Sequence, residues 1–267
     1  MQAKLYVILG SHACRTAMLM LEHKGITYET VELPSGLHPF LLRLHGFAGN
    51  PRSFRRLDGD SSLLLGSLDR MGTVPALLID GERVKTNHRI ARALDRARPE
   101  PRLFPADPGL RSEVEQAERW GDEELQMAAR RVAMAGALHE RDFMATDGRL
   151  GPLLSRSETA RRIGARLVGR FIFRAGGEEE SELLKRVPAM LDRIDAWIEA
   201  GVLNGKELYA ADFAITPSLA LLTYRRDLRP EIEHRPAIAL LDRLLPEPGS
   251  VAMAYSQSHV SEHSHSS

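Results

Sequence analysis

The sequence predicts an α/β domain followed by an all-α domain, and three features of the chain support this fold class. Strand-like and helix-like segments alternate as far as residue 98, in the order βαβ–ββα. Residues 99–108 contain four prolines, which disfavour a helix and indicate an extended linker. After this linker, apolar residues recur only at helical spacing. We therefore expect one domain at 1–98 and a second at 109–245.

The first segments are typical of a βαβ unit. Residues 4–9, KLYVIL, are β-branched, aromatic or apolar apart from Lys4 and are bounded by Gly10, which predicts a buried strand. Residues 14–25 are rich in Met, Leu and Ala and end at Gly25, as a helix would. In residues 26–33, ITYETVEL, apolar and polar residues alternate, which predicts a second strand. A strand, a helix and a strand in this order form a parallel pair.

The next segments form a long connection and a hairpin. Residues 34–72 carry several loop signals, and we expect a short helix near 37–45 within a stretch that is functional or mobile. Ala76–Ile79 and Arg83–Lys85 are predicted strands, joined by Asp-Gly, a strong hairpin signal. A helix is expected at 87–98 with Asn87 as its N-cap.

The second domain is predicted to be wholly helical. One apolar stripe marks a long helix at 108–136: Val114, Ala117, Gly121, Leu125, Ala128, Val132 and Ala135. Further helices are expected at 157–174, 182–200 and 210–224, and Pro217 implies a kink or a late start in the last of these. The Ser- and His-rich residues 246–267 are expected to form a disordered tail.

Composition limits the function classes. The chain has 36 basic and 36 acidic residues, so its formal net charge of zero argues against a nucleic-acid binder. A single cysteine excludes an internal disulfide and a Cys-rich metal site, and we expect no metal. No apolar run reaches the length of a membrane span or a signal peptide. We expect a soluble, cytoplasmic protein.

The chemistry-bearing residues gather in GSHACRT, residues 10–16, between the first strand and the first helix. Cys14 stands at the second position of a C-x-x-C spacing, where a resolving thiol would act on the nucleophilic cysteine of the first position. The first position is Ser11, so that nucleophilic cysteine is missing. A buried Cys is usually a small apolar filler, with a monothiol redox role as the alternative. His12 has no visible partner and is interpreted as a loop side chain.

Three stretches resemble cytosolic glutathione transferases. They are GSHACRTAMLMLEHKGITYETVEL, GTVPALLIDGERVKTNHRIARALD and, in the helical part, LFPADPGLRSEVEQAERWGDEEL together with LYAADFAI. The resemblance spans most of residues 3–225, and its Val-Pro-Ala-Leu segment is fairly specific for the thioredoxin-like fold. It implies a thioredoxin-like N-terminal domain, an all-helical C-terminal domain, glutathione as co-substrate without another cofactor, a detoxification enzyme and a homodimer.

The resemblance also implies roles for individual residues. The Val74–Pro75 bond would be cis, so that the Val74 backbone pairs with the cysteinyl unit of glutathione as one more strand would. Ser11 matches the serine of the Ser-type classes, whose hydroxyl stabilises the thiolate. Thr86 and Asn87 fall where the family has Gln or Glu followed by Ser to hold the γ-glutamyl end. His38 lies near a position that binds the glycyl carboxylate in some classes.

Two departures from the family pattern concern these roles. Thr86 supplies no negative charge, which weakens recognition of the glutamyl ammonium. Arg89 or Asp95 could compensate for this departure, but neither position matches a ligand-binding residue of the family. Tyr209 replaces the Ser or Thr that precedes Asp212 in a reciprocal capping box, so Asp212 is expected to cap backbone N–H groups alone.

We therefore expect a glutathione transferase that joins glutathione or a related thiol to a hydrophobic electrophile between the domains. Trp120, Met127 and Arg131 on the long helix are candidates for lining that site, but a helical stripe is more often core. Two alternatives remain open. One is a non-catalytic binding or structural protein of the same fold, and the other is a monothiol reductase that acts through Cys14.

Overall fold

The computed structural model describes most of the chain, namely residues 1–8, 10–34, 37–48, 74–137, 139, 143–145, 147–151 and 178–247. Most of the expected 34–72 connection, the expected helix at 157–174 and nearly all of the expected tail lie outside these residues. The described strands are β1 (Ala3–Val7), β2 (Glu29–Glu32), β3 (Ala76–Ile79) and β4 (Glu82–Lys85). The described helices of the first half are α1 (His12–His23), α2 (His38–Leu44) and α4 (Asn87–Ala97).

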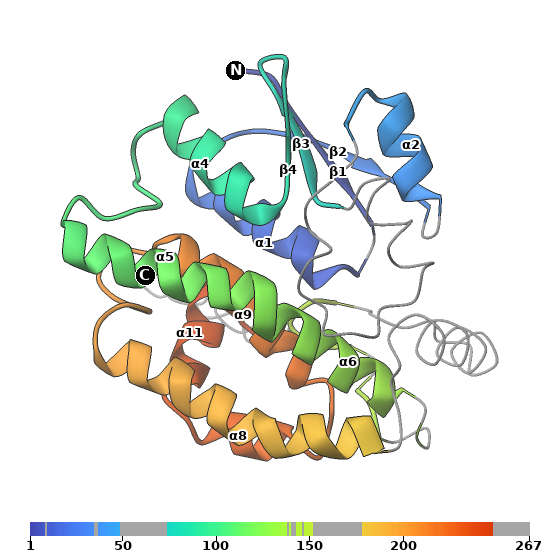
Figure 1. Cartoon of the computed structure of the whole chain (residues 1–267), viewed down its shortest axis with the longest axis vertical. Coiled ribbons are helices and arrows are strands. Elements are labelled where there is room, and N and C mark those ends of the chain that lie inside the picture. Colours follow the sequence, from blue (N-terminus) through green and yellow to red (C-terminus); the bar gives the residue numbers. More distant parts are fainter. Residues whose placement is uncertain are drawn as a thin grey trace, which may run out of the picture.

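The strands form one four-stranded sheet in the order β2-β1-β3-β4 (Figure 1). β1 pairs with β2 in parallel, and β1–β3 and β3–β4 are antiparallel. This order confirms the predicted βαβ–ββα arrangement. Asp80 and Gly81 have φ values of 44° and 88°, as the central residues of a tight hairpin turn with the right twist require.

Alternation along the strands divides the sheet into two faces. Leu5 and Leu77 belong to the core shared with α1 and α4. Tyr6 and Ala76, their neighbours in sequence, pack instead with Leu42 of α2 in a second cluster. Helix α2 therefore covers the opposite face of the sheet from α1 and α4.

The second half is helical in every element that the structure describes. Its elements are α5 (Pro108–Trp120), η1 (Gly121–Leu125), α6 (Gln126–Gly136), α8 (Glu178–Glu199), α9 (Ala210–Leu222), α10 (Arg229–Glu233) and α11 (Ala237–Leu244). Figure 1 shows α5 and α6 as one long rod, with α9 behind it and α1 between this half and the sheet. All residues of the predicted stripe are buried, which confirms the apolar face of the long helix.

The long helix is not uniform, however, because η1 is a turn of π-helix. At Gly121 a Cβ would lie 3.0 Å from Ile215 Cγ1 and 3.3 Å from Ala214 Cβ. Helix α9 therefore packs directly on the backbone of the wide turn. Sequence periodicity did not reveal this turn, since the stripe stays buried through it.

Helix α9 is buried along its whole length and begins at Ala210, so of the two effects expected of Pro217, a kink or a late start, the late start does not occur. Its first turn is fixed by Asp212, which accepts hydrogen bonds from the backbone N–H of Asn204 (2.6 Å) and Tyr209 (2.8 Å). The predicted capping role of Asp212 is confirmed. Burial raises the pKa of Asp212 to about 6, against the lowering effect of these bonds.

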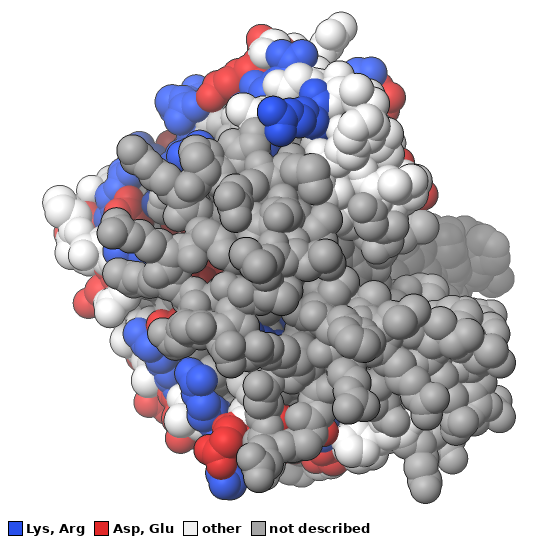
Figure 2. Space-filling model, turned by 45° about the vertical axis from the view of Figure 1, so that its right-hand side comes forward, with Lys and Arg blue, Asp and Glu red and all other residues white. Residues whose placement is uncertain are grey.

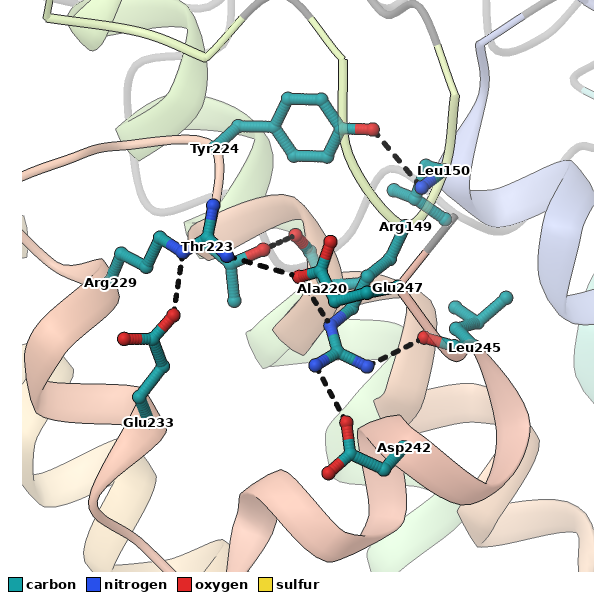
Figure 3. Close-up of polar contacts among 10 residues, drawn as sticks. All are labelled: Arg149, Leu150, Ala220, Thr223, Tyr224, Arg229, Glu233, Asp242, Leu245 and Glu247. Carbon is teal, nitrogen blue, oxygen red and sulfur yellow. Dashed lines mark hydrogen bonds and ion pairs between the residues drawn. The ribbon is translucent and has the colours of Figure 1, made fainter. Parts of the chain in front are cut away.

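A second polar anchor holds the C-terminal helices together (Figure 3). The Arg149 guanidinium donates to the Leu245 carbonyl and to Asp242, each at 2.7 Å. The Tyr224 hydroxyl accepts a hydrogen bond from the Leu150 N–H at 3.0 Å. These contacts fix residues 147–151 against the chain around α9 and α11.

Figure 2 shows basic and acidic side chains interspersed over the described part of the face in view. Within the described ranges, no helix is both long enough and apolar enough to cross a bilayer.

The linker is anchored by a buried ion pair. Lys24 is fully buried and forms an ion pair with Asp95, and it also donates to the Arg98 carbonyl at 2.7 Å. Asp95 in turn accepts the backbone N–H of Leu103 at 2.8 Å. The Asp95 carboxylate is thus used in structural contacts, so it does not supply the negative charge that Thr86 lacks.

Replacing Asp95 by Ala is expected to lower the free energy of unfolding by about 3 kcal/mol, because it leaves the Lys24 ammonium buried without its counter-ion. Glu82→Ala is the matched control, since the Glu82–Arg96 pair is exposed and worth less than about 1 kcal/mol. Urea denaturation measures both. Equal losses in the two variants would contradict a special role for the buried pair.

Candidate active site

Three chain segments meet at one edge of the sheet. Tyr6 of β1 lies opposite Ala76 of β3, and Ala76 lies opposite Lys85 of β4. The residues that follow β1, precede β3 and follow β4 are therefore neighbours. These segments carry most of the predicted site residues: Ser11, Cys14, Val74, Pro75, Thr86 and Asn87. The Val74–Pro75 bond is cis, as expected.

Ser11 is the N-cap of α1. Its Oγ accepts a hydrogen bond from the Cys14 backbone N–H at 3.4 Å, which leaves the hydroxyl proton unused by that contact. The side chain is half-buried and stands at the positive end of a 12-residue helix. Ser11 can therefore donate a hydrogen bond to an anion held at this helix end.

Thr86, not Asn87, occupies the N-cap position of α4, so the prediction of an Asn87 cap was wrong. Thr86 has φ 70° and ψ 141°, a region that β-branched residues rarely adopt. Because the chain turns sharply at Thr86, Asn87 becomes the first helical residue. Its Nδ2 donates to the Ala13 carbonyl of α1 at 3.1 Å, whereas its buried Oδ1 has no hydrogen-bond partner in the described part of the chain.

His12 is buried in the first turn of α1, so its interpretation as a loop side chain without a partner was wrong. Its Nε2 lies 3.3 Å from the Gln126 carbonyl at the start of α6. A carbonyl oxygen can only accept, so Nε2 carries the proton in this contact. Burial, reinforced by the charge of Arg130, lowers the pKa of His12 to about 3. His12 is therefore neutral near pH 7.

Arg130 follows Gln126 by one turn on the same face of α6. Its positive charge acts on both His12 and Cys14, so it lies near the N-terminal turn of α1. Burial lowers the pKa of Arg130 itself. The helical half thus adds a partly desolvated cation near the N-terminal turn of α1, a contribution that sequence reasoning missed.

Asp122, in the π-helical turn η1, is a second contribution of the helical half that sequence reasoning missed. Its Oδ1 is buried and has no hydrogen-bond partner among the described residues. Burial, followed by the charge of Glu118, raises the pKa of Asp122 to about 7, against hydrogen bonds from Asn87 and the His88 N–H. The only signal in the sequence was an acid directly after Gly121, a member of the buried stripe.

Cys14 is buried, with 2% of its surface exposed. Burial raises the pKa of its thiol, outweighing the hydrogen bond with Ser11 and the charge of Arg130. A thiol that resists ionisation is a poor nucleophile. These properties favour the interpretation of Cys14 as a filler of the core.

The remaining candidates lie elsewhere. His38 begins α2, which covers the other face of the sheet, and no described hydrogen bond or ion pair joins it to Ser11 or to the start of α4. Burial lowers the pKa of His38. Trp120 is buried edge-to-face against Trp197 of α8, with ring centroids 5.2 Å apart, as a core residue would be. Met127 and Arg131 are half-buried on α6.

Neither a protein-family model nor a curated protein matches this sequence. Solved structures do match. A glutathione S-transferase from Rhodospirillum rubrum is 18% identical at a TM-score of 0.55, over 90% of this chain and 87% of that one. A glutathione S-transferase from Ceriporiopsis subvermispora, in complex with glutathione, is 15% identical at a TM-score of 0.60, over 91% and 96% of the chains.

The chain has the glutathione S-transferase fold. The β-etherase LigF from Sphingobium sp. also shares this fold, with 20% identity, a TM-score of 0.58 and coverage of 96% and 100%. The sequence resemblance to glutathione transferases is thus confirmed at the level of the fold. The ends of β1, β3 and β4, where most predicted site residues lie, belong to the thioredoxin-like part of this fold.

Replacing Thr86 by Gly is expected to raise the free energy of unfolding by about 1 kcal/mol, because glycine adopts a positive φ without strain. Thr86→Val keeps the β-branch and should bring no gain. Urea denaturation compares the three proteins. A loss of stability in Thr86→Gly would show that Thr86 is not strained.

Cys14 is expected to react with a disulfide reagent such as 5,5′-dithiobis(2-nitrobenzoate) far more slowly in the folded protein than in urea, because the folded thiol is buried and its pKa is raised. The release of the coloured thiolate measures both rates. Equal rates would show that the folded thiol is accessible and that Cys14 can act as a nucleophile.

Proposed function

We propose that this protein is a Ser-type glutathione transferase that joins glutathione, or a related low-molecular-weight thiol, to a hydrophobic electrophile. One observation carries the proposal: the half-buried Ser11 hydroxyl stands at the positive end of α1, at the end of the sheet shared with Val74–Pro75 and the start of α4. The complex of the Ceriporiopsis subvermispora enzyme with glutathione supports this class of ligand.

In this proposal the thiol peptide lies extended along that edge. The Val74 backbone, directly before β3, pairs with the cysteinyl unit as an added strand would. The free backbone N–H groups and the dipole at the start of α4, an 11-residue helix, receive a carboxylate of the ligand. These contacts bring the sulfur to Ser11.

The thiolate is stabilised by three groups at the end of α1. Lowering a thiol pKa by about two units requires roughly 2.7 kcal/mol of preferential interaction with the anion. A charge-assisted hydrogen bond from Ser11 contributes about 1.5–3 kcal/mol and the helix end about 0.3–1 kcal/mol. The Arg130 charge acts in the same direction. No general base is required, which agrees with a neutral, buried His12.

The chemical step is a nucleophilic displacement or addition. The thiolate sulfur forms a bond to the electrophilic carbon, and a leaving group such as a halide departs with the electron pair of its bond. The thiol proton has already passed to solvent. Fixing the sulfur beside the electrophile supplies the acceleration from proximity and orientation. We place the electrophile between the two halves, beside α6. We also infer a cytoplasmic homodimer, because dimers are usual among glutathione transferases.

One specific observation favours a second candidate, a binding protein of this fold without catalysis. Thr86 and Asn87 carry no acid for the glutamyl ammonium. A monothiol reductase is less favoured, because Cys14 is buried and its pKa is raised.

Ser11→Ala is expected to lower kcat/KM for glutathione and 1-chloro-2,4-dinitrobenzene by about 10- to 100-fold, the equivalent of the lost charge-assisted bond. It should also raise the pKa of the bound thiol, seen as thiolate absorbance near 240 nm. Cys14→Ala is the matched control one turn away and should keep both properties.

Three outcomes decide between the candidates. Loss of activity in Cys14→Ala with retention in Ser11→Ala would support the reductase. Binding of glutathione without turnover of any tested electrophile would support the binding protein. Absence of binding at millimolar glutathione, in a folded protein, would contradict the proposal, and a screen of other low-molecular-weight thiols would then follow.

A further inference from the structure

We propose that Asp122 is the specificity-determining carboxylate of this site and receives the ammonium group of a thiol that carries a free α-amino group. The inference rests on the proposed function and adds the ligand class to it. The acid that position 86 lacks in the first half is, in this account, delivered by η1 of the helical half. The ligand selected is a zwitterionic aminoacyl thiol rather than any small thiol.

Asp122 is available, unlike the other acids near the start of α4. Glu118 is buried and paired with Arg92 at 2.9 Å and with His88 at 3.2 Å. Asp95 is paired with Lys24. Among the described residues, no ion pair involves Asp122, and its Oδ1 is buried without a hydrogen-bond partner. Among the described acids near the start of α4, Asp122 is therefore the one without an ion pair.

The position of Asp122 suits one end of an amino acid. Its carboxylate faces Asn87 and the His88 N–H, the first turn of α4. Asn87 is 95% buried, and its own Oδ1 is also unpaired. The helix end offers N–H donors for a carboxylate, and the two unpaired oxygens beside it can accept from an ammonium. Together these donors and acceptors complement the carboxylate and the ammonium group that share one α-carbon.

The local structure holds Asp122 there. Helix α9 packs on the backbone of Gly121, the preceding residue, so closely that a Cβ would contact Ile215 at 3.0 Å. The π-helical turn then carries Asp122 toward α4. Wide turns of this kind are frequent at functional sites, and here the turn is fixed by the core.

Keeping this carboxylate carries a cost in stability. Burial holds its folded pKa near 7, above the ordinary 3.8, with Glu118 opposing ionisation and Asn87 and His88 favouring it. The nearby Arg92 is paired with Glu118. Because the folded pKa is the higher one, the contribution of Asp122 to stability is full below about pH 4 and is lost as pH rises through about 7. An acid kept unpaired against stability is typical of a binding group.

The test compares two ligands that differ by one amino group. Glutathione and glutaryl-cysteinylglycine, its analogue without the amine, are titrated calorimetrically at pH 8. The wild-type protein is expected to prefer glutathione by about tenfold or more, which is about 1.4 kcal/mol. Asp122→Asn should bind both ligands equally, at the affinity of the analogue. Glu123→Gln, an exposed acid in the same turn, is the control and should keep the preference.

A second readout separates binding from folding. Asp122→Asn without ligand is expected to be more stable than the wild type at pH 8 and closer to it at pH 5, since the amide carries no buried charge. A variant that is less stable and loses affinity for both ligands alike would show a structural role and overturn the inference. Equal binding of both ligands by the wild type would overturn it while leaving the proposed function intact. Failure of both ligands to bind to the folded protein would refute the proposed function, and this inference with it.

Discussion

Helix α1 is held between the sheet and α9, and the site depends on this constraint. Its side chains belong to one continuous core that joins the sheet to the helical half. Near its C-terminal end, His23 packs against Phe213 of α9, with ring centroids 5.0 Å apart, and Lys24 is locked by Asp95. The opposite end of the helix, where Ser11 stands, is therefore positioned by packed helices rather than by a free loop.

The N-terminal turn of α1 collects groups from both halves of the chain. Asn87 reaches it from α4, and Gln126 meets His12 from α6. Two ionisable residues of the helical half accompany these contacts, Arg130 near Cys14 in the first turn of α1 and Asp122 near the start of α4. In our proposal the sheet edge supplies backbone pairing, whereas the helical half supplies Arg130 for the thiolate and Asp122 for the ammonium group of the ligand.

Local sequence signals predicted the fold well, because strands, turns and helices depend on interactions between residues that are close in the sequence. The alternating strands, the Asp-Gly hairpin and the helical stripe each follow from periodicity or turn preference, and the structure confirms them. The candidate catalytic and thiol-binding residues all lie in the first half of the chain, and they stay predictions. Gln126 meets His12 across 114 positions, so contacts of this kind depend on how the halves dock. The cap of α4 was misplaced because the turn is made by the unusual φ of Thr86, which its residue type does not reveal.

The most direct test of the central claim is a crystal structure of the protein with glutathione bound. The account predicts the sulfur within hydrogen-bond distance of Ser11 Oγ, with the peptide paired along Val74 and its amino-acid end at the start of α4. A sulfur directed away from Ser11, or joined to Cys14 in a mixed disulfide, would contradict it.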